Sequence, residues 1–270
     1  MKAVRIHEYG GPEVLRVEDV AEPECGPKDV LVQVRASSIN PIDYKMRAGG
    51  QRAVVWLRFP SLLGMDISGT VLEVGSKVTA FAVGDDVFAS PSHWRLGSWA
   101  QRIAVRESEL AHKPANITHE QAASIPLVGL TAWDCLVGAC NVQPGQRVLI
   151  QAGSGGVGSI AIQLARHLGA EVLTTCSPRN HELVADLGAT TMIDYKTQDW
   201  TTEAKDVDVI LESVGGDDID RAITTVRKGG RIAAITANLP DWTERSGPAL
   251  GLTQMIGTTA WRMLRARVTR

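Results

Sequence analysis

The chain has 270 residues, of which 44% are hydrophobic and 21% charged, a balance typical of one large or two modest globular domains. Its formal net charge of -2 supplies no basic surplus for phosphates or anionic lipids, so we expect no nucleic-acid and no membrane partner. The four cysteines form no C-x-x-C pair, which argues against a disulfide framework and a structural zinc site. Together with the absence of a signal-peptide pattern at the start, this favours a cytoplasmic setting.

The first part of the chain reads as antiparallel β-structure. Short apolar or alternating runs at residues 30–34, 69–74 and 86–88 are separated by turn signals at Gly75 and Gly84, and strands at this spacing predict a barrel or sandwich. One helix interrupts them, with Asn40 as its N-cap and Pro41 as its first residue. A second helix is predicted to open at Thr118, because Gln121 completes a capping box.

After Pro144 the pattern changes to alternating strands and helices. Strands are predicted at 148–151, 172–175, 192–194, 207–211 and 231–235, with a helix that ends at Gly169 and another from Ser177 and Pro178 to near Gly188. This alternation predicts a doubly wound α/β domain of the Rossmann type, with a parallel sheet and helices on both faces.

A glycine-rich segment lies directly between the first predicted strand of this part and its helix. It consists of Gly153, Ser154, Gly155, Gly156, Val157 and Gly158 and satisfies G-x-G-x-x-G. In this context the glycines allow a tight turn, a close approach of the backbone to a pyrophosphate, and close packing of helix on strand. A merely flexible turn is the alternative, but the flanking strand and helix favour a dinucleotide site.

The end of the second strand indicates which dinucleotide binds. NAD-specific sites place an acidic residue there to hold the ribose hydroxyls. This chain has Ser177 and Arg179 instead, and a hydroxyl and a guanidinium favour the 2′-phosphate of NADPH. The alternative, in which Ser177 caps the helix and Arg179 is solvated, is compatible with that role.

With these elements in place, the chain resembles the medium-chain dehydrogenases/reductases, in their zinc-independent quinone-oxidoreductase branch, over nearly its whole length. The segment at 64–66 and the stretch before Pro60 are most similar to the reticulon-interacting reductases. The order and spacing of the matching segments carry the resemblance: Asn-Pro-Ile-Asp at 40–43, Gly-Met-Asp at 64–66, 69–75, Gly-Asp-Asp-Val at 84–87, Gly-Ser-Trp-Ala at 97–100, Gly-Leu-Thr-Ala-Trp at 129–133, the glycine loop and Ile-Asp-Tyr at 193–195.

The resemblance implies a GroES-like β-barrel domain at 1–122, on the substrate side, and a Rossmann NADPH-binding domain at 123–270, with the nicotinamide in the cleft between them. In this family the positions of Ser177 and Tyr195 contact the adenosine end of the cofactor. Asn40 and Thr131 match positions near the nicotinamide, and Val214 follows the fourth strand, where a cofactor ribose lies. Without the resemblance, Tyr195 would read as an ordinary half-buried strand aromatic.

No metal is expected. Zinc-dependent relatives supply a Cys and a His-Glu pair as ligands, and the corresponding positions here are Asn40 and Met65-Asp66. The six histidines show no ligand spacing.

Two departures from the family pattern bear on catalysis and assembly. Many relatives that reduce enones carry a Tyr as candidate proton donor where this chain has Gln51, which leaves Tyr44 as the candidate catalytic residue. After the strand at 231–235 the chain ends at Arg270, where relatives continue with a last strand that builds a dimer interface. The Rossmann domain is therefore expected to be truncated at its C-terminal end, and a homodimer is left open.

The predicted reaction is zinc-independent hydride transfer from NADPH to a quinone or an α,β-unsaturated carbonyl, because conjugation in the acceptor stabilises the developing negative charge without a metal. The alternative is an NADPH-binding sensor or partner-binding protein with little catalytic activity. A third possibility, a simple alcohol dehydrogenase, requires zinc ligands that the sequence does not offer.

Overall fold

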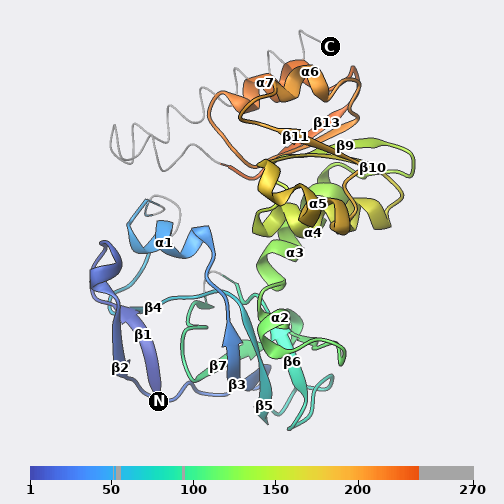
Figure 1. Ribbon diagram of the computed structural model, residues 1–270. Helices are drawn as coiled ribbons and strands as arrows, with labels where there is room; N and C mark the ends of the chain where they lie inside the picture. The colour runs from blue at the N-terminus through green and yellow to red at the C-terminus, as the bar shows by residue number, and fades with distance from the viewer. Residues whose placement is uncertain (51, 53–55, 93–94, 237–270) are drawn as a thin grey trace. The chain divides into compact units, whose positions relative to one another are not determined.

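The computed structural model describes residues 1–236 except 51, 53–55 and 93–94. The chain divides into two compact units, Met1–Leu127 and a second that begins at Val128, and both are drawn in Figure 1. Each is described by itself. The expectation about the chain end concerns residues 237–270, which lie outside the described residues.

The first unit is built on two antiparallel sheets. The strands of the larger sheet lie in the order β7-β3-β5-β6-β8 and those of the smaller in the order β2-β1-β4. A single bridge between Ala3 and Ala100 joins β1 to the chain just before β7. The strands are β1 (Lys2–Ile6), β2 (Arg16–Asp19), β3 (Asp29–Ser37), β4 (Ser61–Leu62), β5 (Ile67–Val74), β6 (Asp86–Ala89), β7 (Arg102–Arg106) and β8 (Ala111–His112).

The predicted runs at 30–34, 69–74 and 86–88 therefore are strands, and alternation explains their packing. Val30 and Val32 point to one face of β3 and are fully buried with Val71, Val87 and Val105. β3 and β5 shift register twice along their pairing, and such bulges bend a sheet. The antiparallel character of this unit is confirmed, whereas β1, β2, β4, β7 and β8 were not predicted.

Two helices of this unit begin where the sequence indicates. α1 (Pro41–Arg47) follows Asn40, whose backbone N–H donates to Asp43 Oδ2 at 2.7 Å. α2 (His119–Ala123) opens on a capping box: Gln121 N donates to Thr118 Oγ1 at 3.3 Å, and Thr118 N donates to Gln121 Oε1 at 3.0 Å. The predicted cap at Thr118 is confirmed.

In the described part of the second unit, five parallel strands lie in the order β11-β10-β9-β12-β13. The chain runs outward from β9 to β11 and then returns to the other side of β9, so the strand order reverses between β9 and β12. Ligands of open α/β sheets bind outside the carboxyl ends of the strands at such a reversal. The strands are β9 (Arg147–Ile150), β10 (Glu171–Cys176), β11 (Thr191–Asp194), β12 (Val209–Glu212) and β13 (Arg231–Ala234).

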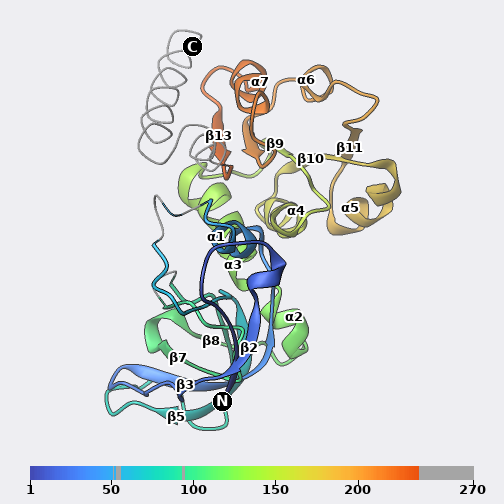
Figure 2. The same ribbon diagram turned by 90° about the vertical axis from the view of Figure 1, so that its left-hand side faces the viewer.

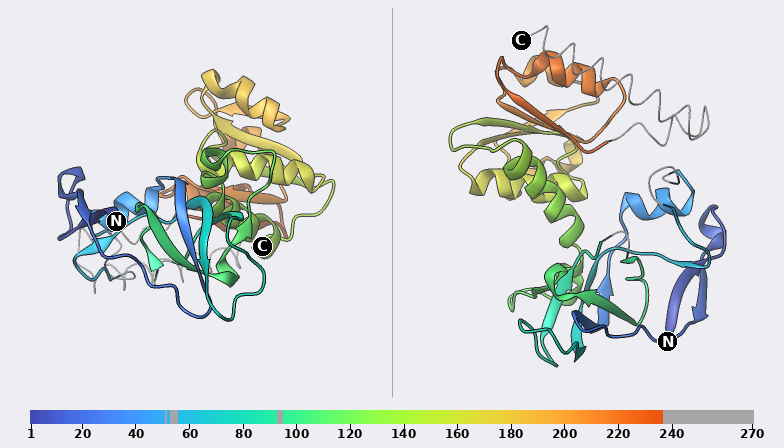
Figure 3. Two further views of the ribbon diagram at one scale, coloured as in Figure 1. Left: turned by 90° about the horizontal axis from the view of Figure 1, so that it is seen from below. Right: turned by 180° about the vertical axis from the view of Figure 1, so that it is seen from behind.

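Helices cover both faces of this sheet. On one face Ile150 and Val172 pack against α4 and α5, and on the other Leu149 and Ile210 pack against α6 and α7. Figure 1 shows the strands between the two helix pairs, Figure 2 shows α4 and α5 side by side, and Figure 3 repeats the arrangement from below and behind. The helices are α3 (Pro126–Trp133), α4 (Gly156–His167), α5 (His181–Leu187), α6 (Trp200–Glu203) and α7 (Asp218–Thr225).

The predicted Rossmann sheet is confirmed, with local differences. The helix expected to open at Ser177 starts as a 3-10 turn at Pro178–Asn180, and α5 begins only at His181. Gln151, expected in the first strand, lies just beyond it. Among the described residues, no helix combines the length and the apolar character required to cross a membrane.

Candidate functional site

The parallel register of the second sheet brings the predicted cofactor residues to one edge. Ile150 of β9 lies opposite Thr174 of β10 and Leu211 of β12, and Cys176 of β10 lies opposite Asp194 of β11. The segments that follow these strands therefore leave the sheet at the same, carboxyl edge. They carry the residues of the glycine loop at 153–158, Ser177, Arg179, Tyr195 and Val214.

The glycine loop is fastened to the end of β10. Gly153 N donates to Thr175 O at 3.0 Å, and Ala152 N donates to Thr175 Oγ1 at 3.0 Å. Ala152 has φ +50°, in the left-handed region that L-residues other than glycine rarely adopt. Two hydrogen bonds that one threonine accepts thus hold the turn between β9 and α4.

The three motif glycines meet different surroundings. A Cβ on Gly153 would lie 1.9 Å from Thr174 Oγ1, and one on Gly158 would lie 2.3 Å from the carbonyl oxygen of Ala152. A Cβ on Gly155 would come no closer than 3.1 Å to any atom, and Gly155 is exposed. Gly153 and Gly158 are thus required by packing inside the protein, whereas Gly155 presents bare backbone to the outside.

Gly155 is also the N-cap of α4, and no side chain caps that helix. The first N–H groups of a helix have no partner within it, and the helix dipole adds partial positive charge at the same place. A backbone without Cβ atoms in front of such N–H groups can hold the two phosphates of a dinucleotide. The loop therefore fits a pyrophosphate.

A polar bracket that sequence reasoning missed joins this loop to the turn after β10. Asn180 Nδ2 donates to Ser154 Oγ at 2.9 Å and, more weakly, to Ser177 Oγ at 3.4 Å. Because the amide is the donor, both hydroxyls accept from it and keep their own hydrogens to donate elsewhere. Ser177 occupies the N-cap position of the turn without capping it through its side chain.

The other side chains at this edge face outward. Arg179 is exposed and makes no hydrogen bond or ion pair to the described residues. Tyr195 is 55% exposed and Val214 57% exposed. Tyr195 follows β11 rather than forming part of it, so it is not the half-buried strand aromatic considered as an alternative.

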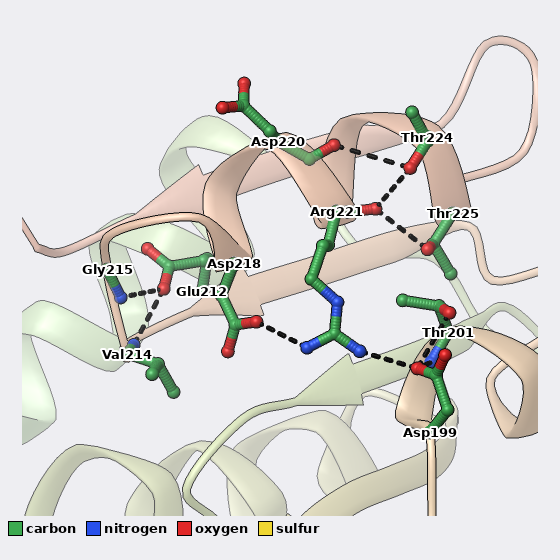
Figure 4. A network of polar contacts seen from close by, with 10 residues as sticks. All are labelled: Asp199, Thr201, Glu212, Val214, Gly215, Asp218, Asp220, Arg221, Thr224 and Thr225. Carbon is green, nitrogen blue, oxygen red and sulfur yellow. Dashed lines mark hydrogen bonds and ion pairs between the residues drawn. The ribbon is translucent and has the colours of Figure 1, made fainter.

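Glu212, which the sequence analysis did not single out, shapes the loop after β12. It is fully buried, and its Oε1 accepts from Val214 N at 2.7 Å and from Gly215 N (Figure 4). Its Oε2 accepts from Thr236 Oγ1 at 2.7 Å. The only sequence signal is an acidic residue at the end of an otherwise apolar strand.

In the same view, Arg221 ties α7 to α6. Its guanidinium binds Asp218 at 2.8 Å and Asp199 at 2.5 Å (Figure 4) and lies 4.9 Å from the centroid of the Trp200 ring.

In the first unit, Asn40 belongs to a buried polar cluster. Its Nδ2 donates to Asp66 Oδ2 at 2.8 Å and to Ser38 Oγ at 3.0 Å. Asp66, also fully buried, accepts from Ser38 Oγ at 2.6 Å and from Leu127 N at 2.9 Å. Both carboxylate oxygens of Asp66 are therefore engaged.

Three further residues were considered in the sequence analysis for catalysis or for contact with the nicotinamide. Tyr44 lies on α1 and is 48% exposed. Thr131 is half-buried on α3 of the second unit, one turn after Val128, which lies beside Gly156. Gln51 is outside the described residues.

Asp43 is a buried acid next to this cluster. Burial raises the pKa of Asp43 to about 6, against the lowering effect of the Asn40 N–H that donates to it, and the negative charge of Asp66 adds to the rise. Its Oδ1 has no hydrogen-bond partner among the described residues.

Within the described part of the chain, no group of three or more His, Cys, Asp or Glu side chains is arranged to hold a metal ion.

Two family profiles match the two units. One, described as alcohol dehydrogenase GroES-like domain, covers residues 26–115. The other, described as zinc-binding dehydrogenase, covers residues 156–255.

Individual proteins are similar over most of the chain. A zebrafish (Danio rerio) mitochondrial NAD(P)H oxidoreductase named RTN4IP1 is 36% identical over 98% of this chain and 74% of its own length. A chloroplastic NADPH-dependent alkenal/one oxidoreductase of Arabidopsis thaliana is 38% identical over 87% of this chain and 62% of its own length. The solved structure of a quinone oxidoreductase from Coxiella burnetii superposes with a TM-score of 0.82 at 32% identity, covering 99% of this chain and 88% of that one.

Gly158→Ala is expected to destabilise the protein more than Gly155→Ala does. The added methyl at position 158 meets two backbone groups of the loop, Ala152 O at 2.3 Å and Gly153 Cα at 2.7 Å, and the resulting strain of about 1–3 kcal/mol exceeds the gain of about 1 kcal/mol in helix propensity. At position 155 we expect a loss below about 1 kcal/mol. Urea unfolding of both variants checks this, and equal losses would contradict the distinction.

Asp43→Asn is expected to remove a pH-dependent cost of folding. The folded pKa of Asp43 is raised above its ordinary value of 3.8, so its effect on stability is most favourable below about pH 4 and is lost as the pH rises through about 6. Linkage sets an upper limit of about 3 kcal/mol for this loss. The variant should therefore gain stability relative to the wild type between pH 4 and 7 in urea unfolding. Asp134→Asn, at an exposed carboxyl, is the matched control and should show no such gain.

Proposed function

Because the chain belongs to the medium-chain dehydrogenase/reductase family, in its quinone-oxidoreductase-like branch, we propose that it is an NADPH-dependent oxidoreductase that transfers hydride to a quinone or an α,β-unsaturated carbonyl without zinc. The observation that carries the proposal is the bare, uncapped start of α4 at Gly155, at the point where the strand order reverses. The Coxiella and Arabidopsis relatives support the two acceptor classes by their names.

In this proposal the second unit binds the cofactor. The backbone of residues 153–158, with Ser154 and Val157 among them, holds the pyrophosphate. Ser177, Arg179 and Tyr195 hold the adenosine end, and Val214, fixed by Glu212, lies at a ribose. We assign the cofactor domain to residues 123–270 and the barrel domain, on the substrate side, to 1–122.

The choice of NADPH over NADH rests on the charge and donors after β10. Arg179 is an exposed guanidinium without an ion pair to the described residues, and guanidinium pairs well with phosphate. Ser154 and Ser177 accept from Asn180 and can therefore donate their own hydrogens to phosphate oxygens. No carboxylate occupies either of the positions 177 and 179. The Arabidopsis relative, named as NADPH-dependent, supports the same choice.

The chemistry requires few groups from the protein. When bound, the reduced nicotinamide supplies the hydride, and an acceptor with conjugated carbonyls stabilises the resulting charge itself. Asn40 and Thr131 are proposed to lie near the nicotinamide, and the exposed hydroxyl of Tyr44 is the proposed proton donor.

The donor chemistry at Asn40 and Asp66 supports independence from zinc. Zinc is held by thiolate, imidazole and carboxylate groups. Asn40 offers an amide, and both oxygens of the Asp66 carboxylate already accept protein hydrogen bonds.

The cytoplasmic setting stays a prediction, since the two named relatives are a mitochondrial and a chloroplastic protein.

Turnover tests the proposal directly. Purified protein mixed with NADPH and a panel of quinones and enones should consume NADPH, followed by absorbance of the reduced nicotinamide, and metal chelation should leave the rate unchanged. Binding of NADPH without turnover on any acceptor would instead support a sensor or partner-binding protein. Absence of NADPH binding would refute both.

Arg179→Glu is expected to weaken NADPH binding by about tenfold or more, because the charge reversal places a carboxylate at the 2′-phosphate. NADH binding should change by less than about threefold. Isothermal titration with both nucleotides measures the two affinities. Lys228→Glu, at another exposed cation of this unit, is the control, and an equal loss for NADPH and NADH would show that Arg179 does not contact the 2′-phosphate.

Asn180→Asp is expected to shift the preference from NADPH toward NADH. The carboxylate would accept from Ser154 and Ser177 and so turn both hydroxyl hydrogens away from the 2′-phosphate, while adding a negative charge beside it. The dissociation constant for NADH divided by that for NADPH should fall by about tenfold. Asn180→Ala, which removes the bracket without adding charge, should produce a smaller shift, and an unchanged ratio in Asn180→Asp would disprove the role of the bracket.

A further inference from the structure

The first unit contains a cavity with an excess of positive charge. Its volume is about 680 Å³, and its charged lining residues are Lys28, Asp29, Lys77, Arg95, Arg106 and Glu107. Four cations thus face two carboxylates, in a chain whose formal net charge is -2. All of these residues lie in Met1–Leu127, whereas the glycine loop belongs to the second unit.

The two carboxylates of the cavity are already engaged. Asp29 Oδ1 accepts from Arg95 Nη1 at 2.9 Å. Glu107 Oε1 accepts from the backbone N–H groups of Thr79 and Ala80 at 2.6 Å each, and these bonds lower the pKa of Glu107. Neither carboxylate forms an ion pair with Lys28, Lys77 or Arg106.

These three cations are exposed and make no ion pair with any described residue. They nevertheless lie on segments that backbone hydrogen bonds and strand pairing join to one another. Lys77 N donates to Pro27 O at 2.8 Å, and Glu107 N donates to Lys28 O at 3.1 Å. Arg106 is the cross-strand partner of Asp29 between β7 and β3. The backbone therefore fixes the base of each cationic side chain around one cavity.

We propose that this cavity binds a small phosphorylated molecule that carries at least two phosphate groups. The planar donors of Arg106 pair with two oxygens of one phosphate, and the ammonium groups of Lys28 and Lys77 neutralise further charge. The volume falls within the range of small-molecule sites, about 300–1,000 Å³. Ser108, which also lines the cavity, adds a hydroxyl donor. This site does not depend on the proposed oxidoreductase activity.

Calorimetric titration with inorganic pyrophosphate at an ionic strength of about 0.15 M, where exposed charges more than about 8 Å apart are screened, tests the site. Wild-type protein should bind, and the double variant Lys28→Ala/Arg106→Ala should bind at least about tenfold more weakly. Both side chains are exposed, so the variant should keep the thermal unfolding temperature of the wild type.

The matched control is Lys205→Ala/Lys228→Ala, which removes two exposed cations from the second unit and should change pyrophosphate affinity by less than about threefold. Three results would overturn the proposal: no binding by the wild type, an equal loss in both double variants, or a loss confined to the control. Unchanged binding in Lys28→Ala/Arg106→Ala would likewise overturn it and would point to the glycine loop, whose backbone neither variant alters. NADPH titration of Lys28→Ala/Arg106→Ala should match the wild type, so the outcome is separate from that of the proposed cofactor site.

Discussion

The close approach of α4 to the turn after β9 is the constraint on which the candidate cofactor site depends. At Gly158 the helix lies so near the loop that a single methyl would overlap the Ala152 carbonyl. This approach directs the uncapped end of α4 toward the carboxyl edge of the sheet, where the parallel register also delivers the segments after β10, β11 and β12. The anion-binding geometry is thus a consequence of backbone packing, with side chains added around it.

Two buried carboxylates hold loops in a comparable way, one in each unit. Glu212 accepts two backbone N–H groups of the turn at Val214, and Asp66 accepts from the side chains of Ser38 and Asn40 and from a backbone N–H. A buried charge is tolerated only when such donors compensate its desolvation. Removing the donors would therefore destabilise the loops as well as the acids, which ties the positions of Val214 and Asn40 to the folded core.

Local patterns in the sequence were sufficient for the parts of the fold that short-range physics determines. Alternation identified the central strands of the barrel unit, helical spacing and glycine identified α4, and the capping box identified the start of α2 at Thr118. The short strands β1, β2 and β4 were not predicted because they form by pairing with segments that are distant in the sequence, as Arg5 pairs with Leu62. The role of Asn180 was missed for the same reason, since its hydrogen-bond partner Ser154 is 26 positions away. No local sequence pattern indicates that an asparagine in a turn binds such a distant residue.

The net charge of the whole chain does not predict the local charge around the cavity of the first unit. A net charge of -2 gives no reason to expect an anionic partner, and for a surface as extended as nucleic acid that reasoning holds. A small ligand, however, responds to charges within roughly 8 Å at physiological ionic strength. Around Lys28, Lys77 and Arg106 the nearby carboxylates are occupied by Arg95 and by backbone N–H groups. The cavity therefore has a net positive local charge, with four cations against two carboxylates, and the acidic residues elsewhere on the chain contribute little to it.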